Sequence, residues 1–303
     1  MNLRLLGTEP WSRRLAVATL VANVALVVTG GFVRLTGSGL GCPTWPRCTD
    51  RGFTPHGAFN AHASIEFGNR MLTFVLAAVA VATLVSAWQS GRRELRRPAL
   101  LLALSIPAQA VLGGLTVLTG LNPWLVSAHF MFSMGIVSLG VLYLLRVARP
   151  APWGQRPGGT GDLLRRLTYA AAAAVLAVGA VVTGSGPHAG DATAPRNGLD
   201  PERLSQLHAD LVFLLVGLTV ALLVLRRSRA VTVLLVVELA QAVVGFVQYF
   251  TGLPVLVVGL HLLGAGLLAA AATWVLLEGS PVEPGDEWGA VPDAALRSRG
   301  SHG

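Results

Sequence analysis

The sequence predicts an all-α polytopic membrane protein, in which eight transmembrane helices form two four-helix bundles related by a pseudo-twofold axis. An apolar composition and an internal repeat carry this prediction. Of the 303 residues, 53% are hydrophobic and 13% are charged. This composition is too apolar for a soluble globular domain and is typical of a chain that crosses a membrane several times.

Eight apolar segments are long enough to span a membrane, since about 20 helical residues cross a hydrocarbon layer of about 30 Å. We expect helices because open sheet edges cannot face lipid, and because the segments lack the alternating pattern of barrel strands. In chain order, the segments lie at about 15–35, 66–88, 98–119, 124–146, 164–184, 205–225, 230–251 and 255–277.

The internal repeat relates residues 108–129 to residues 240–261 without a gap, at an offset of 132 residues. The copies read AQAVLGGLTVLTGLNPWLVSAH and AQAVVGFVQYFTGLPVLVVGLH. Apolar segments match by chance at Leu, Val and Ala, but here a glutamine, a Thr-Gly-Leu triplet and the final histidines, His129 and His261, also match. These polar and glycine matches in register favour an internal duplication.

The arginines orient the predicted bundle. All 23 basic residues are arginines, and most of them precede the first span or follow the second, fourth and sixth spans. By the positive-inside rule, we expect both termini to be cytoplasmic. We expect the protein to lie in the plasma membrane, with its functional site near the extracytoplasmic side. The net charge of +8 then reflects topology and anionic lipid, and a nucleic-acid partner is not expected. The opposite loops carry only Arg47, Arg51, Arg196 and Arg203.

The spans divide the chain into two halves. We expect an N-terminal four-helix half at 1–150, a Pro/Gly-rich cytoplasmic linker at 151–163, a C-terminal four-helix half at 164–278 and a disordered cytoplasmic tail at 279–303. Because each half contains four spans, both halves have the same membrane orientation. Such repeats are related by an axis along the membrane normal.

Three histidines lie inside apolar spans at a similar depth, about 8 to 9 Å below the outer surface for His129 and His261. His208 lies at that level on the sixth span, so His208 and His261 can face each other in the second half. A single intramembrane histidine more often bonds a neighbouring helix, but three at one depth favour heme ligation. Zinc is disfavoured, since the second half lacks further ligands of Cys or carboxylate type at that depth.

The second span begins with a polar helical face formed by His62, Glu66, Asn69 and Arg70. Glu66 and Arg70 are four residues apart, so they can form an ion pair that eases burial. Alternatively, a partly desolvated Glu66 moves protons or stabilises positive charge at a reacting carbon. Both interpretations remain open. Glu238, in the middle of the seventh span, is expected to bond a neighbour and to face the bundle interior.

Cys42 and Cys48 are the only cysteines and lie on the first outer loop, in GLGCPTWPRC. Disulfides persist on the extracytoplasmic side of a membrane, so a disulfide is favoured over free thiols or an exposed redox pair. No c-type heme attachment motif is present.

These features together resemble the heme A synthase family, especially its actinobacterial form. The resemblance covers about residues 15–277 and is carried by VTGGFVRLTGSGLGCPTWPRC, EFGNR, the repeated TGL and histidine, and GPHAGD. It implies an enzyme that oxidises the C8 methyl of heme O to a formyl group, giving heme A for terminal oxidase assembly. A bound b-type heme would be the electron-transfer cofactor.

The resemblance also implies roles for individual residues. His208 and His261 would be the axial ligands of the cofactor heme b, His129 would bind the iron of the substrate heme, and Glu66 would be catalytic. Cys42 and Cys48 would form a disulfide.

One position departs from the family pattern. Many members have a histidine three residues after the glutamate, where this chain has Asn69, and an amide is a poor heme ligand. Iron bound by His129 alone is therefore the simpler expectation. His62 is a second candidate ligand, but it lies about 10 Å further along the helix.

Other expectations are weaker. Arg34 and Arg70 are candidates for heme propionate contacts, although arginines that snorkel to the interface are as common. His188, in an outer loop, would contact a propionate or lie in solvent. The resemblance suggests heme O synthase (a protoheme farnesyltransferase) and cytochrome c oxidase as partners. The sequence names no electron donor or acceptor, and a homo-oligomer remains open.

Two other classes of function fit part of the pattern. A two-heme b-type cytochrome that relays electrons from quinol would use the same histidines. A transporter would use duplicated halves, but its polar residues would lie at the membrane midplane.

Overall fold

The computed structural model describes residues 6–55, 60–148 and 159–278, and these residues form eight helices and no β-sheet. All eight are long and apolar enough to cross a membrane, which confirms the predicted fold class. The predicted tail and most of the predicted linker lie outside the described residues. The helices are α1 (Glu9–Leu35), α2 (Ala61–Gln89), α3 (Arg93–Leu118), α4 (Pro123–Ala148), α5 (Thr160–Ser185), α6 (Pro201–Leu225), α7 (Arg229–Phe250) and α8 (Val255–Leu277).

Several helices begin earlier than the apolar segments predict, because capping residues rather than hydrophobicity set their first turns. The side chain of Asn60 accepts hydrogen bonds from the first backbone N–H groups of α2, and Asp200 does the same for α6. Pro201 then occupies the first helical position, where its missing N–H costs nothing. α5 begins at Thr160, so the last residues of the predicted linker are helical.

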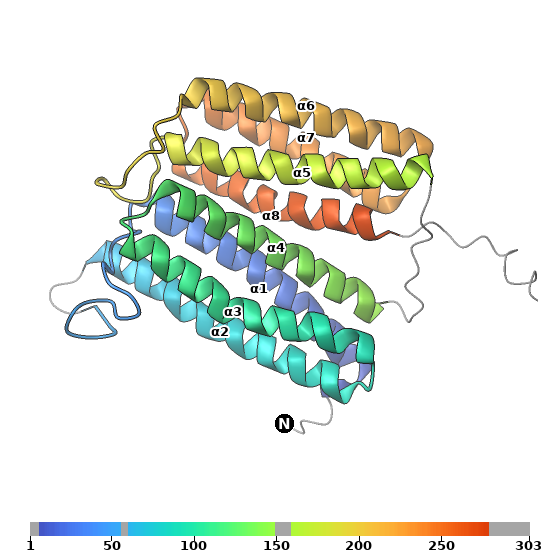
Figure 1. The fold of residues 1–303 in the computed structure, drawn as a ribbon, viewed down its shortest axis with the longest axis horizontal. Helices are drawn as coiled ribbons and strands as arrows, with labels where there is room; N and C mark the ends of the chain where they lie inside the picture. The colour runs from blue at the N-terminus through green and yellow to red at the C-terminus, as the bar shows by residue number, and fades with distance from the viewer. Residues whose placement is uncertain (1–5, 56–59, 149–158, 279–303) are drawn as a thin grey trace, which may run out of the picture.

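The helices form two four-helix groups that lie side by side (Figure 1). In the first group α1 contacts α2 and α4, and α3 contacts α2 and α4; in the second, α5 to α8 repeat these pairs. The groups meet through three contacts, α1 with α8, α4 with α5, and α4 with α8. Exchanging α1 with α5 and α4 with α8 reproduces this set, as a pseudo-twofold arrangement requires. The axis itself stays a prediction.

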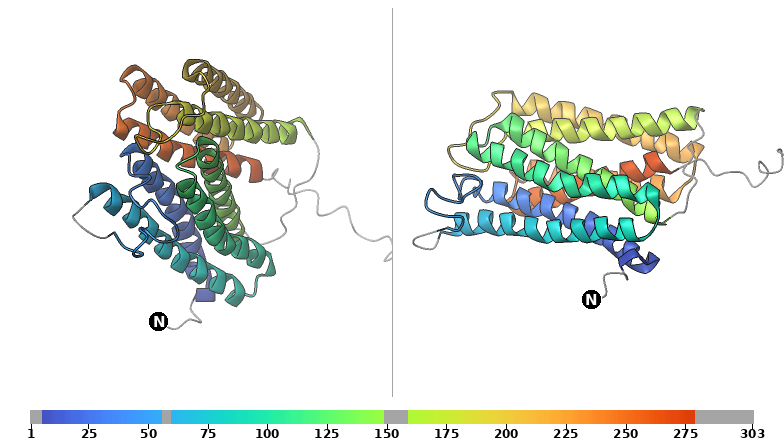
Figure 2. Two further views of the ribbon diagram at one scale, coloured as in Figure 1. Left: turned by 60° about the vertical axis from the view of Figure 1, so that its left-hand side comes forward. Right: turned by 60° about the horizontal axis from the view of Figure 1, so that its bottom comes forward.

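The two ends of the bundle differ in the length of their connections. The α1–α2 and α5–α6 loops extend from one end, which we call the long-loop end, and the N-terminal start of α1 lies at the opposite end (Figures 1 and 2). The sequence assigns the long-loop end to the extracytoplasmic side.

Side chains pack most densely toward the opposite end. On α7 the buried residues run from Ala230 to Glu238, and no residue from 239 to 250 is buried. On α6 the buried residues are Leu215, Thr219 and Leu222, all beyond His208 along the helix. These two helices are therefore packed mainly below the level of the histidines of the second half.

Small hydroxyl side chains join helices inside the bundle. Ser12 bonds Ser86, and Thr19 bonds Thr83, each with 2.8 Å between the side-chain oxygens, along the contact of α1 with α2. Such pairs let helices approach closely and satisfy polar groups that lipid cannot.

The two copies of the sequence repeat have the same backbone geometry. The last two residues of each Thr-Gly-Leu triplet have positive φ, 61° and 62° in the first copy and 76° and 60° in the second. In both copies the Leu N–H donates to the carbonyl five residues earlier, at 2.7 Å for Leu121 and 2.8 Å for Leu253. The same tight turn therefore precedes α4 and α8, which carry His129 and His261.

The orientation can be tested by labelling with a membrane-impermeant maleimide. Ala192→Cys lies in the α5–α6 loop and should be labelled in intact cells, whereas Gln89→Cys, at the opposite end, should be labelled only after lysis. The parent protein is the control, because both of its cysteines are in a disulfide. The reverse pattern would show that the predicted orientation is wrong.

Candidate functional site

His208 on α6 and His261 on α8 face each other in the second half. Their ring centroids are 6.5 Å apart and the rings are inclined at 69°. Nδ1 of each ring is buried and has no hydrogen-bond partner among the described residues. A metal–imidazole bond is about 2 Å long, so rings on opposite sides of one metal ion have centroids about 6 Å apart. The pair thus has the spacing of two axial ligands.

Each of the three intramembrane histidine rings lies against a glycine of a neighbouring helix. A Cβ atom added to Gly179 would lie 2.9 Å from Cε1 of His208, a distance that forces one of the groups to move. The absence of a side chain on the facing helix therefore makes room for the ring. Gly113 is similarly close to His129, at 3.0 Å, whereas a Cβ atom on Gly245 would lie 3.6 Å from His261, which is an ordinary contact.

A glutamine holds the backbone beside the repeated histidines. Nε2 of Gln109 donates to the carbonyl of His129 at 3.2 Å, and Nε2 of Gln241 donates to the carbonyl of His261 at 2.9 Å. Both copies of the sequence repeat therefore contain the histidine together with the glutamine and the glycine that contact it from the neighbouring helix.

In the first half, two of the candidate site residues also have buried polar atoms without partners. Nδ1 of His129 and Oδ1 of Asn69 are both buried without a hydrogen-bond partner among the described residues. His62 differs, because its side chain is exposed and Nδ1 is 3.0 Å from Oγ of Ser38. That contact places His62 in the loop network, and its role as an iron ligand stays a prediction.

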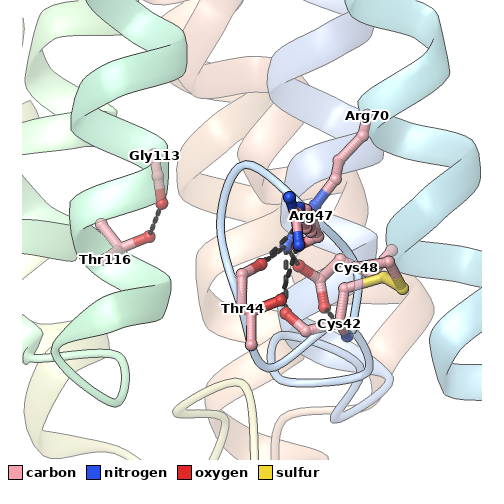
Figure 3. A network of polar contacts seen from close by, with 8 residues as sticks. Cys42, Thr44, Arg47, Cys48, Arg70, Gly113 and Thr116 are labelled. Carbon is pink, nitrogen blue, oxygen red and sulfur yellow. Dashed lines mark hydrogen bonds and ion pairs between the residues drawn. A yellow bond between two sulfur atoms is a disulfide. The ribbon is translucent and has the colours of Figure 1, made fainter. Parts of the chain in front are cut away.

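Glu66 is 5% exposed and its carboxylate has fixed partners. The Cys42 N–H donates to Oε2 at 2.6 Å, and Nη2 of Arg70 donates to Oε1 at 2.5 Å. Figure 3 shows the Arg70 guanidinium reaching into the α1–α2 loop, where it also donates to the carbonyls of Cys42, Thr44 and Arg47. The predicted ion pair is present, and it also ties the start of α2 to the loop.

The α1–α2 loop is closed by the predicted disulfide between Cys42 and Cys48, whose side chains are both fully buried. Inside this ring, the Trp45 side chain packs against Gly114 of α3, where a Cβ atom would collide with the indole. The loop therefore covers the long-loop end of the first half and holds Cys42 N–H at the Glu66 carboxylate.

The α5–α6 loop joins both halves through contacts that the sequence did not predict. Arg34 of α1 donates to the carbonyls of His188 and Thr183, at 2.7 Å and 2.9 Å. The His188 ring is half-buried, with Nε2 2.9 Å from the carbonyl of Leu253, so the expectation that it lies in solvent is wrong. The one sequence feature that pointed to His188 was its position within GPHAGD, a segment that carries the family resemblance. Arg34 and Arg70 both bond backbone carbonyls, and their propionate contacts stay predictions.

Glu238 on α7 is 2% exposed, and Oγ1 of Thr219 on α6 donates to its Oε1 at 2.7 Å. The expectation that Glu238 bonds a neighbour and faces the bundle interior is confirmed.

The fold and these residues define a polytopic membrane protein with histidines on helices of both halves and a tethered carboxylate in the first half. The family model of the cytochrome oxidase assembly protein (COX15-CtaA) matches residues 13–200, more than half of the chain. The chain belongs to this family. The match ends before His208 and His261.

Curated relatives have a more specific name. The Heme A synthase of Bacillus pumilus (strain SAFR-032) is 35% identical over 126 residues, which is 40% of this chain and 40% of that protein. The Heme A synthase of Geobacillus kaustophilus (strain HTA426) is 31% identical over 134 residues, 43% of this chain and 41% of that protein. The similar region thus spans less than half the length of these relatives.

The role of Arg70 in holding the disulfide loop can be tested by the rate of disulfide reduction. Arg70→Leu removes several charge-assisted hydrogen bonds, each worth about 1.5–3 kcal/mol, so a small thiol should reduce Cys42–Cys48 about tenfold faster or more. Trapping the free thiols by alkylation gives the rate. Arg51→Leu, at an exposed position of the same loop, is the control. Equal rates in both variants would contradict the proposed tether.

Proposed function

We propose that this protein is a heme A synthase that oxidises the C8 methyl of heme O to a formyl group. The division of chemistry between the halves carries the proposal: a facing histidine pair lies in the second half, and a histidine with a tethered carboxylate lies in the first. The names of the curated relatives support the same activity. The product, heme A, would supply cytochrome c oxidase, and heme O would come from heme O synthase.

The second half, 164–278, would hold a b-type heme as cofactor. Its iron would bind His208 and His261, supported by their 6.5 Å centroid spacing and by Gly179, which makes room for the His208 ring. When bound, this heme supplies reversible one-electron transfer. The two histidines are half-buried among the helices of this half, and neutral imidazole is the form that binds iron.

The first half, 1–150, would hold the substrate heme. His129 would bind its iron from α4, with Gly113 and Gln109 positioning the ring and its backbone. Asn69 cannot supply a second imidazole, so the substrate iron would be five-coordinate. That arrangement leaves one face of the iron open.

Glu66 would act at the reacting carbon. Conversion of a methyl to a formyl removes four electrons from that carbon, and an external oxidant must accept them. Two successive hydroxylations would give a geminal diol, which loses water. Glu66 would accept a proton or stabilise positive charge that develops on the carbon. Arg70 and the Cys42 N–H would keep the carboxylate in one orientation for either role.

The most direct test of the activity is the heme content of the protein purified from cells that supply heme O. Extraction and mass separation should yield heme B together with heme O and heme A. Heme B alone, at two per chain and without conversion, would support instead a two-heme cytochrome that relays electrons.

The catalytic role of Glu66 predicts a separation of binding from turnover. Glu66→Gln keeps an acceptor for the Cys42 N–H, so heme content should stay near that of the parent while heme A formation falls at least about 100-fold. Glu94→Gln, which alters an ion pair with Arg92 at the opposite end of the bundle, is the matched control. Full heme A production by Glu66→Gln would rule out the catalytic role.

The predicted ligation of the substrate iron can be tested at Asn69. In the parent, the absorption and paramagnetic resonance spectra of the heme O-loaded protein should contain a high-spin, five-coordinate component. Asn69→His should convert this component to a low-spin, six-coordinate one, because a second imidazole becomes available. A low-spin substrate heme already present in the parent would contradict ligation by His129 alone.

A further inference from the structure

Glu238 is a buried acid for which the proposed reaction has no use. It lies in the middle of α7, is 2% exposed, and has Oε1 bonded to Thr219 at 2.7 Å. Its second oxygen, Oε2, is buried without a hydrogen-bond partner among the described residues. No basic side chain pairs with this carboxyl group in the described part of the chain, unlike Glu66, whose carboxylate is paired with Arg70. An ionisable group in such a place is costly and marks a function more often than packing.

The sequence repeat shows that this acid belongs to the second half alone. At the repeat offset of 132 residues, the position of Glu238 in the first half is occupied by Ile106. The matched helices otherwise share the glutamine and the glycine that adjoin the histidine. At this position, therefore, only the half that has the His208–His261 pair has a carboxyl group.

Glu238 is close to that pair along the helix axis. Gln241, three residues further along α7, donates to the carbonyl of His261 at 2.9 Å. Three residues correspond to about 4.5 Å of helix rise. Glu238 thus lies about one helical turn below the level at which α7 bonds the backbone of a proposed heme ligand.

The surroundings of Glu238 contain little charge that could compensate for its own. α7 packs against α6 and α8. Residues 211–225 of α6 include no titratable side chain, and α8 has only His261. Asp210, nearer the long-loop end of α6, is exposed and accepts a hydrogen bond from Gln206 at 2.8 Å. On α7 itself, Arg229 lies at the far end of the helix.

We propose that Glu238 is a proton-binding site coupled to reduction of the heme held by His208 and His261, an inference that rests on the proposed cofactor site. A ferric porphyrin with neutral imidazoles has one net positive charge, and a ferrous one has none. An ionised Glu238 balances the first state, whereas in the second state it would be an isolated charge in an apolar interior.

The coupled step is balanced by one electron and one proton. Glu238 takes up a proton from water, so that its carboxylate becomes a carboxylic acid, when an external one-electron reductant reduces the iron. On reoxidation the same proton leaves. Thr219 keeps one oxygen of Glu238 hydrogen-bonded in both states.

The test is a spectroelectrochemical titration of the heme b in the purified full-length protein, repeated from mildly acidic to alkaline pH. The parent should have a pH range in which the midpoint potential of the heme falls by about 59 mV for each unit increase in pH. Glu238→Gln, which has the same shape and cannot take up the proton, should have a potential independent of pH in that range. Glu202→Gln, at an exposed position in the first turn of α6, should behave as the parent does.

The inference would be overturned if the midpoint potential of Glu238→Gln changed with pH as steeply as that of the parent, or if the potential of the parent did not change with pH. Either result would leave the cofactor site intact. A protein without a low-spin, bis-histidine heme would overturn the cofactor site and the inference together. Thr219→Val is a second variant. Because it removes the hydrogen-bond donor to the carboxylate, the pH range in which the midpoint potential depends on pH should move to higher pH. An unmoved range would contradict the role of Glu238 even if Glu238→Gln failed to fold.

Discussion

The structure depends on the constraint that an imidazole inside an apolar bundle must be held by its neighbours, because no water is present to solvate it. Each intramembrane histidine lies against a glycine on the facing helix, and for His129 and His208 a side chain at that position would collide with the ring. His129 and His261 add a glutamine that bonds the backbone carbonyl. The same tight turn precedes α4 and α8, so His129 and His261 follow it at equivalent positions of their helices.

The two halves have diverged around this shared plan in the placement of their carboxyl groups. In the first half, Glu66 lies at the start of α2 and is anchored by Arg70 and by the disulfide loop. In the second half, Glu238 lies mid-span, about one turn below the level at which α7 bonds the His261 backbone, and Thr219 is its one hydrogen-bond partner among the described residues. An acid anchored at the start of a helix suits chemistry on a substrate that enters and leaves, whereas an acid buried in mid-span suits charge balance at a permanent cofactor.

Much of the fold could be predicted from the sequence, because apolar length and the repeat register depend on local pattern alone. The eight spans, the facing of His208 and His261, and the Cys42–Cys48 disulfide follow from such patterns. The helix starts could not be placed as well, since caps such as Asn60 determine them. Loop contacts were the least predictable: the Cys42 N–H at Glu66 and the contacts of His188 depend on the path of long loops, which no periodicity specifies.

The central claim is that the second half, and not the first, holds a permanent heme between His208 and His261. The most direct measurement is the heme content and spin state of His208→Ala and His129→Ala, both purified from cells that make only heme B. The account predicts that His208→Ala loses the low-spin heme and that His129→Ala retains it. A low-spin heme that survives in His208→Ala, or that disappears in His129→Ala, would contradict the account.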